Sequence, residues 1–290
     1  MRMLTSTSVV RFSNGDFQTQ TDVVVAEEPL EIRVGGRPIS VTMRTPEHDI
    51  ELAAGFLLSE GVVRQREDIL RIRSCPRTNS GNSIDVVLDP NVRFDFESLT
   101  RHVFAASSCG LCGKATIDAI RTRLDPIAEV DAPRVSAELI AAMPETMRRA
   151  QRAFDRTGGL HAAALFDETG RLLVVREDVG RHNAVDKVLG RALLEGLLPL
   201  ERHVLVVSGR TSFEIMQKAL AGRIPIVAAV SAPSSLAVEF ARANRQTLIG
   251  FLREGRMNIY SGHERLGCQA ILEAGVEVHA EEASLFEEAD

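Results

Sequence analysis

Two cysteines stand close together in a glycine-rich stretch, SCGLCGK at residues 108–114, and their sulfur atoms could do chemistry. Cys109 and Cys112 have C-x-x-C spacing, and Lys114 follows two residues later. We expect a helix from Lys114 to Leu124, because apolar residues recur there at helical spacing. The positive end of a helix and a neighbouring cation both stabilise a thiolate. Such a thiolate can attack a sulfur donor and hold the transferred sulfur as a persulfide.

Two other chemistries use the same cysteine spacing. Structural zinc needs four ligands, but the remaining cysteines, Cys75 and Cys268, are isolated and fit packing roles. A dithiol oxidoreductase fits the spacing, although its motif normally follows a strand within a β-α-β unit. Here the pair precedes the region in which strands and helices alternate. We predict no stably bound metal, and the oxidoreductase interpretation stays open beside sulfur transfer.

Three polar loops in the second half of the chain each stand between an apolar strand-like run and a helix-like run. They are EDVGRHNAVDK at 177–187, SGRTSFE at 208–214 and SAPSS at 231–235. Loops of this kind gather at the carboxyl ends of parallel strands, where ligands bind. Ser208, Gly209 and Arg210 could bind an anion at a helix N-terminus. Thr211 and Glu214 predict a capping box at that same helix.

Further candidate ligand-binding side chains occur in the first loop and near the C-terminal end. His182 and Asn183 belong to a group of polar residues too varied to serve only as a solvated first turn of a helix. His161 begins a strand-like run after two glycines, where a lone histidine is more often structural. Arg253 and Arg256 flank a glycine and could clamp a phosphate, since guanidinium groups bind phosphate oxygens bidentately. The alternative for these two arginines is an exposed hairpin.

Two different patterns of secondary structure follow one another along the chain. Residues 7–43 carry short β-rich runs between turn signals, which predict antiparallel strands. A helix is expected over 50–59, and residues 68–96 return to strands. From about residue 158, apolar strands alternate with short helices, which predicts a mainly parallel sheet covered on both faces.

A connection containing proline and aspartate at 126–136 separates the two patterns. A helix predicted over 136–154 follows it. We therefore predict a β-rich N-terminal domain at residues 1–135 and an α/β domain at residues 136–290.

Composition narrows the class of protein. The chain has 290 residues, of which 44% are hydrophobic and 26% charged, as is normal for a soluble globular protein. A net charge of −6, the absence of tryptophan and a single tyrosine argue against nucleic-acid binding. No apolar run approaches the ~20 residues of a membrane span, and the N-terminus lacks the apolar segment of a signal peptide. We expect a cytoplasmic protein that contacts neither nucleic acid nor membrane.

Six stretches together resemble the formate dehydrogenase accessory sulfurtransferase family (FdhD/NarQ type). They are SSCGLCGK, TGGLHAAAL, EDVGRHNAVDKVLG, VSGRTSFEIMQKAL, SAPSSLAVEFA and GFLREGRMNIYS. They run in the family's order and cover most of residues 20–262, which makes the resemblance specific. The segment after residue 262, including Cys268, departs from the family pattern.

The resemblance implies a function. Members accept sulfur from a cysteine desulfurase and pass it to the molybdenum cofactor, bis-molybdopterin guanine dinucleotide, before its insertion into formate dehydrogenase. Cys109 matches the persulfide-carrying cysteine, and Cys112 matches the second one, a candidate assisting thiol. The cofactor-binding stretch matches Phe251, Leu252, Arg253, Glu254, Gly255 and Arg256, with contributions expected from His182, Asn183, Ser208, Gly209 and Arg210. GDP copies the guanine nucleotide end of the cofactor.

The resemblance also implies an architecture and partners. The expected fold is α/β (α+β overall), with a cytidine-deaminase-like three-layer α/β/α C-terminal domain and a smaller β-rich N-terminal domain. Deaminase chemistry is not implied, because His161-Ala162-Ala163 lacks the glutamate of the H-x-E motif. The expected partners are the cysteine desulfurase, the formate dehydrogenase apoenzyme and a second copy in a homodimer. A chaperone that binds the cofactor without transferring sulfur, and so needs neither cysteine, is a further alternative.

Overall fold

The structure is a computed structural model that describes residues 3–75, 82–94, 96, 124–128 and 133–267. The predicted sulfur site, Cys109 and Cys112, lies outside these residues, as do Cys268 and the helix expected from Lys114. The remaining predictions on secondary structure can be compared with the elements observed.

A four-stranded sheet forms the core of the N-terminal unit, in the strand order β4-β3-β6-β5. Its strands are β3 (Glu28–Val34), β4 (Arg37–Arg44), β5 (Ile69–Ser74) and β6 (Ser83–Leu88). The helix α1 (Asp49–Ser59) packs on this sheet, and the short 3-10 helix η1 (Arg66–Asp68) precedes β5. The β3–β4 turn is made by Gly35 and Gly36, both at positive φ. The strands and the helix predicted here are confirmed.

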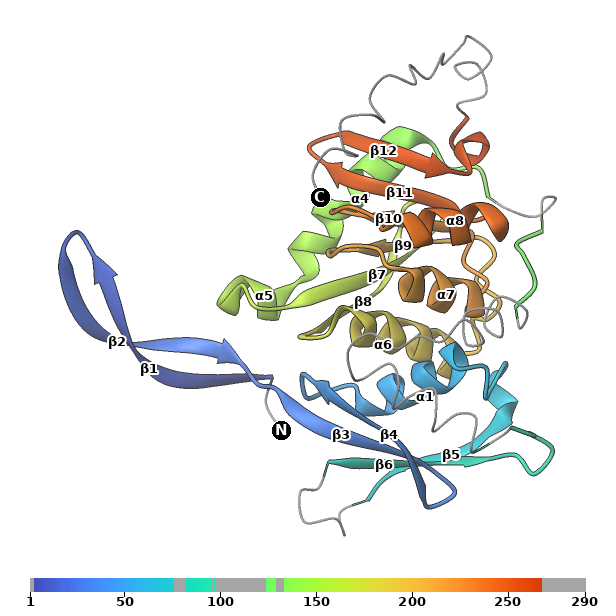
Figure 1. The fold of residues 1–290 in the computed structure, drawn as a ribbon, viewed down its shortest axis with the longest axis horizontal. Helices are drawn as coiled ribbons and strands as arrows, with labels where there is room; N and C mark the ends of the chain where they lie inside the picture. Colours follow the sequence, from blue (N-terminus) through green and yellow to red (C-terminus); the bar gives the residue numbers. More distant parts are fainter. Residues whose placement is uncertain (1–2, 76–81, 95, 97–123, 129–132, 268–290) are drawn as a thin grey trace, which may run out of the picture.

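The chain begins with a two-stranded antiparallel hairpin that extends away from the rest of the molecule (Figure 1). Its strands are β1 (Leu4–Ser13) and β2 (Asp16–Val25), joined at the predicted Asn14-Gly15 turn. Phe12 and Phe17 face each other across the tip, with ring centroids 5.0 Å apart.

A six-stranded sheet forms the core of the C-terminal unit, in the order β12-β11-β10-β9-β7-β8. Its strands are β7 (His161–Asp167), β8 (Leu172–Asp178), β9 (His203–Val207), β10 (Ile226–Ala229), β11 (Thr247–Arg253) and β12 (Arg256–Ser261). The β9–β10 and β10–β11 pairs are parallel, whereas β7 pairs antiparallel with both β8 and β9, and β11 with β12. The prediction of a mainly parallel sheet is therefore wrong. Apolar runs alone do not distinguish a strand that returns through a hairpin from one that returns through a helix.

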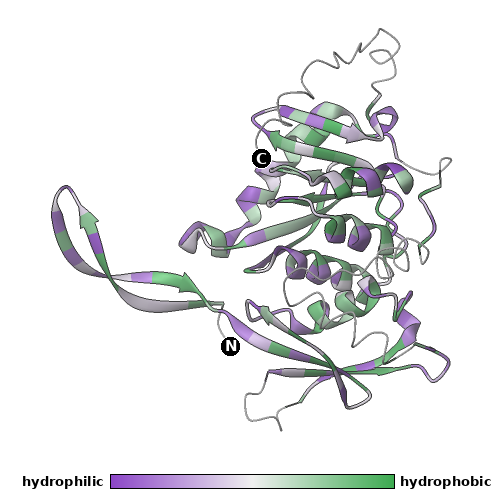
Figure 2. Cartoon of the chain, viewed as in Figure 1, coloured by the Kyte–Doolittle hydropathy of each residue, from purple (hydrophilic) through white to green (hydrophobic). Residues whose placement is uncertain are grey.

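Helices cover both faces of this sheet, which confirms the predicted three-layer α/β/α arrangement. One face packs against α6 (Arg181–Leu194), α7 (Phe213–Ala221) and α8 (Ser235–Ala243). The other face packs against α4 (Ala137–Ala150) and the 3-10 helix η2 (His263–Leu266). The single helix predicted over 136–154 is instead two helices. The helical conformation is interrupted at Gln151, and α5 (Arg152–Thr157) follows. Figure 2 shows hydrophobic residues concentrated on the strands of this sheet and on the helices packed against it.

The two units meet where α1 crosses α6 with their backbones in contact. A Cβ atom added at Gly55 would lie 1.8 Å from the Asp186 carbonyl oxygen, and one at Gly190 would lie 1.8 Å from the Glu51 carbonyl oxygen. Only glycine permits so close an approach. One hydrophobic cluster runs from the four-stranded sheet through α1 and α6 into the six-stranded sheet. The division of the chain at residues 135/136 stays a prediction.

Candidate functional site

One edge of the six-stranded sheet collects most of the predicted binding residues. The strands β9, β10 and β11 end at this edge, and β7 begins there because it runs antiparallel to β9. The edge therefore brings together His161, the loop that follows Asp178, the Ser208–Arg210 loop and the hairpin that begins at Phe251. Polar loops at the ends of strands are where ligands bind in sheets of this kind.

Two helices, α6 and α7, point their N-termini at this edge. Their N-cap residues are Gly180 and Ser212, and neither accepts a side-chain capping bond from its own helix. The capping box predicted from Thr211 and Glu214 is wrong, because α7 begins one residue later than the pattern suggested. First-turn N–H groups left without a side-chain cap carry partial positive charge and favour anions.

His182 lies in the first turn of α6 and contacts the start of α7. Its Nε2 atom is 3.1 Å from Ser212 Oγ and 3.0 Å from Glu214 Oε2. Burial, with Lys218 and Arg181 nearby, lowers the pKa of His182 to about 4. The ring is therefore neutral at pH 7, and its contact with Glu214 is a hydrogen bond rather than an ion pair.

His161 lies beside the Ser208–Arg210 loop. A Cβ atom at Gly209 would be 3.1 Å from His161 Nδ1, so the loop backbone lies close against the imidazole. Burial lowers the pKa of His161, and Arg181 lowers it further. The Ser208 hydroxyl accepts a hydrogen bond from the backbone N–H of Ala162 at 2.8 Å, which holds the loop against β7.

Two buried polar atoms close to this loop lack a hydrogen-bond partner among the described residues. They are Arg181 Nε and Thr211 Oγ1. Thr211 is fully buried, and its backbone N–H donates to the Ala232 carbonyl at 3.1 Å. A buried donor or acceptor without a partner is costly, so a group that arrives at this edge has unsatisfied protein atoms to bind.

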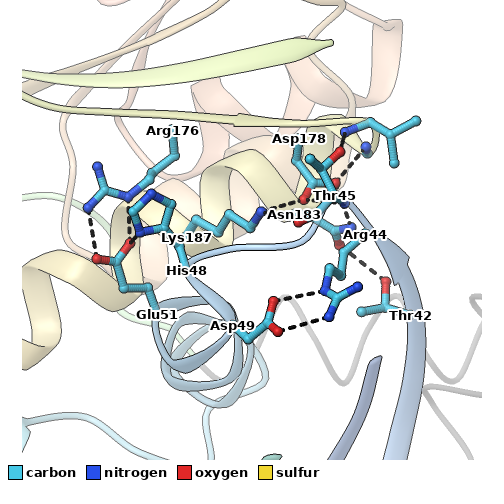
Figure 3. A network of polar contacts seen from close by, with 12 residues as sticks. Thr42, Arg44, Thr45, His48, Asp49, Glu51, Arg176, Asp178, Asn183 and Lys187 are labelled. Carbon is cyan, nitrogen blue, oxygen red and sulfur yellow. Dashed lines mark hydrogen bonds and ion pairs between the residues drawn. The ribbon is translucent and has the colours of Figure 1, made fainter. Parts of the chain in front are cut away.

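A polar network joins the start of α6 to the N-terminal unit (Figure 3). Lys187 Nζ lies 2.7 Å from Asp178 Oδ2, and both side chains are fully buried. Asp178 Oδ2 also accepts a hydrogen bond from the Thr45 N–H at 3.1 Å. Asp178 Oδ1 accepts one from the Gly180 N–H at 2.8 Å. The Asn183 side chain donates to the Met43 carbonyl and accepts from the hydroxyl of Thr42. The cofactor contact expected of Asn183 stays a prediction, and in this structure both polar ends of its side chain are bonded within the protein.

Two more links tie the units together around the α1–α6 crossing. Arg176 makes a two-point contact with Glu51, at 2.5 and 2.8 Å, and His48 lies 3.5 Å from the same carboxylate. Burial alone would raise the pKa of Glu51, but Arg176 and His48 together lower it to about 2.

The second link is centred on Asp186 of α6. Asp186 binds Lys218 at 2.8 Å and accepts from the Ser59 hydroxyl at 2.7 Å. Burial alone would lower the pKa of Lys218, but Asp186 raises it instead. Lys218 thus stays positively charged beside His182.

The predicted cofactor stretch, residues 251–256, is the hairpin between β11 and β12. Phe251 is partly exposed and Leu252 fully buried, so the Leu252 side chain packs in the core. The turn is made by Glu254 and Gly255 at positive φ, and Arg253 is exposed. Arg256 is exposed as well and lies 2.6 Å from the Glu254 carboxylate. Cofactor binding by this stretch stays a prediction.

Two absences concern only the part of the chain that the structure describes. Within it, no group of three or more histidine, cysteine, aspartate or glutamate side chains is arranged to hold a metal ion. None of its helices combines the length and apolarity needed to cross a membrane. The expectation that the protein holds no metal stays a prediction.

The sequence pattern did not predict the hydrogen bonds between the N-terminal unit and the start of α6. Thr42 to Thr45 showed only the signs of a strand end and a helix start. Lys218 is the single basic residue of α7, and nothing nearby in the sequence marks it as the partner of Asp186. Both roles depend on contacts between segments far apart in the chain, for which a single sequence contains no local signal.

The fold and the candidate site define a three-layer α/β/α protein with a polar sheet edge, to which a smaller β-rich unit is hydrogen-bonded. The FdhD/NarQ family profile matches residues 25–267, and the chain therefore belongs to this family.

Individual relatives agree with this membership. The sulfur carrier protein FdhD of Streptomyces coelicolor is 54% identical over 273 residues, which cover 92% of this chain and 97% of that protein. The sulfur carrier protein FdhD of Mycobacterium tuberculosis is 51% identical over 258 residues, covering 86% and 93%. A crystal structure of a protein described as a formate dehydrogenase accessory protein, from Desulfotalea psychrophila, superposes with a TM-score of 0.75 at 26% identity. It covers 91% of this chain and 100% of that one.

Proposed function

We propose that this protein is a sulfurtransferase that carries sulfur as a persulfide on Cys109 and delivers it to bis-molybdopterin guanine dinucleotide for formate dehydrogenase. Family membership supports the sulfur-carrying part, since the relatives described above are named sulfur carrier proteins. The C-x-x-C pair beside Lys114 supports the choice of nucleophile. The donor in this proposal is a cysteine desulfurase, the site of action is the cytoplasm, and the protein works as a homodimer.

The chemistry requires two exchanges at sulfur. In the first, the Cys109 thiolate attacks the outer sulfur of a persulfide on the desulfurase, and the desulfurase cysteine leaves as a thiolate. In the second, Cys112 assists release: its thiolate attacks the Cys109 sulfur, and hydrosulfide departs toward the cofactor. This step leaves a Cys109–Cys112 disulfide, which a cellular thiol reductant must reopen.

The electropositive sheet edge is the observation that best supports cofactor binding. The N-termini of α6 and α7 meet there, the Arg181 side chain lies beside Gly209, and the charges of Arg181 and Arg210 both act on His161. Burial is the main cause of the lowered pKa values of His161 and His182, and the charge of Arg181 lowers both further. A pyrophosphate is the part of the cofactor that such an edge would bind. The hairpin with Arg253 and Arg256 lies at the same edge, within the stretch expected to bind the guanine nucleotide.

The proposal is tested in cells that lack their own copy of this protein. Wild type should restore formate dehydrogenase activity, and Cys109→Ala should not. Cys112→Ala should retain part of the activity if the second thiol only assists release. Full activity with Cys109→Ala would contradict sulfur transfer and favour a chaperone that only binds the cofactor. A requirement for both cysteines without any persulfide would favour the dithiol oxidoreductase.

A further inference from the structure

Residues 42–45 of the N-terminal unit are bonded to the loop that opens α6. The three polar groups of Thr45 all face this loop: its N–H donates to Asp178, its carbonyl accepts from Lys187 at 2.9 Å, and its hydroxyl accepts from the Val179 N–H at 3.1 Å. Asn183 adds a bond of 2.8 Å to the Met43 carbonyl. Every one of these contacts joins segments more than 130 residues apart in the chain.

Asp178 is the centre of these contacts. Its two oxygens receive four donors: Lys187 Nζ, the N–H groups of Thr45 and Gly180, and Asn183 Nδ2 at 3.0 Å. The side chain is fully buried. A carboxylate with this many donors has a defined orientation, because each lone pair is directed at one of them.

The placement of two of these donors matters for the binding edge. Gly180 and Asn183 stand immediately before and after Arg181 and His182 in the chain. The Asp178 carboxylate therefore accepts hydrogen bonds from the residues on both sides of Arg181 and His182, the two residues that lie at the binding edge. The buried Lys187, one turn further along α6, fixes the same carboxylate from the helix side.

We propose that Asp178 is a positioning residue for the binding edge, through which residues 42–45 set the orientation of Arg181 and His182. The N-terminal unit is then part of the ligand site without touching the ligand. This inference rests on the proposed function insofar as the ligand is a guanine nucleotide, but the geometry of α6 can be measured without one.

Three variants test the inference in the full chain. Thr45→Val removes the single bond to the Val179 N–H and keeps both backbone contacts. Asp178→Asn removes the carboxylate charge. The double variant Asp178→Asn with Lys187→Met also removes the buried cation that Asp178→Asn would leave unpaired. Thr247→Val is the control, because Thr247 is a fully buried threonine at the opposite end of β11 that donates to the Gly262 carbonyl.

Two measurements are made on each folded variant: GDP affinity by calorimetry, and the titration of the His182 ring by NMR. We expect the double variant to bind GDP roughly threefold to thirtyfold more weakly, and Thr45→Val to show a smaller loss. The pKa of His182, about 4 in the wild type, should rise toward its ordinary value as the first turn of α6 relaxes. Thr247→Val should change neither quantity.

The outcomes separate this inference from the proposed function. If wild type does not bind GDP, the cofactor proposal fails, and the His182 titration alone decides the role of Asp178. If the folded double variant keeps both the wild-type His182 pKa and the wild-type GDP affinity, Asp178 is only structural and the inference is overturned. Should Asp178→Asn fail to fold, the double variant and Thr45→Val still decide the question.

Discussion

The Lys187 ammonium group and the Asp178 carboxylate form an ion pair at 2.7 Å with both side chains fully buried. Removing one partner of a buried pair leaves the other charge uncompensated, which costs about 3–5 kcal/mol. We therefore expect Lys187→Met to lower the free energy of unfolding by about 3 kcal/mol, as measured by urea denaturation.

An exposed ion pair provides the matched control. Glu145 and Arg149 lie on the surface of α4 at 3.3 Å, and Glu145→Gln should change stability by no more than about 0.5 kcal/mol. Equal changes in the free energy of unfolding for the two substitutions would show that the buried pair stabilises the protein no more than the exposed pair does.

Contact between the backbones of α1 and α6 gives a second prediction. Gly190→Ala would place a Cβ atom 1.8 Å from the Glu51 carbonyl oxygen, so the helices must separate. Overpacking of this kind costs roughly 3 kcal/mol or more where the neighbour is backbone. Thermal unfolding should show a large drop in the melting temperature.

Gly61→Ala separates steric contact from backbone strain. Gly61 has a φ of +72° but no atom within 4 Å of an added Cβ, so its substitution should cost only about 1–2 kcal/mol. A Gly190→Ala protein as stable as Gly61→Ala would mean that the helices are not in the close contact observed.

Acid should weaken the link between the units through Glu51. Its folded-state pKa of about 2 is below the ordinary value of 4.5, so its contribution is fully present above pH 4.5 and is lost as pH falls toward 2. A difference of this size corresponds to about 3 kcal/mol. Unfolding curves at pH 3 and pH 6 should differ less for Glu51→Gln than for wild type. An identical loss of stability in both proteins would assign acid sensitivity to other carboxylates.

Guanine nucleotide binding can be tested arginine by arginine. Each charge-assisted phosphate contact contributes roughly 1.5–3 kcal/mol, so losing one should weaken GDP binding by about tenfold to a hundredfold. Calorimetry with Arg181→Ala, Arg253→Ala and Arg256→Ala would show which arginines bind the phosphates. Arg202→Ala, on an exposed pair with Glu168, is the control that should bind normally. Unchanged affinity in the Arg253 and Arg256 variants would make the 251–256 hairpin an ordinary exposed turn.

Local signals predicted most of the elements. The Asn14-Gly15 and Gly35-Gly36 turns and the α1 helix follow from residues adjacent in the sequence, and all of them are observed. The sequence predicts the start of α7 one residue too early. The spacing of Thr211 and Glu214 fits a capping box, but spacing alone does not show whether their side chains bond to the backbone of the helix. Glu214 instead contacts His182.

Long-range contacts explain what could not be predicted. The bond from the Thr45 N–H to Asp178 spans 133 residues, and no periodicity connects those positions. The sequence predicted a functional role for the polar residues of the 177–187 loop together. Four of them bind the N-terminal unit instead: Asp178, Asn183, Asp186 and Lys187. Asn183 illustrates this: its type suggested a ligand contact, and the structure bonds it to Thr42 and Met43.

The most direct test of the central claim is mass spectrometry of the protein after incubation with a cysteine desulfurase and cysteine. We expect the peptide that contains Cys109 to gain one sulfur atom, and the gain to disappear on treatment with a thiol reductant. Cys109→Ala should show no gain, while Cys112→Ala should still be loaded, because the second thiol acts only in release. A wild-type peptide of unchanged mass, or equal loading of Cys109→Ala, would contradict the claim that Cys109 carries the sulfur.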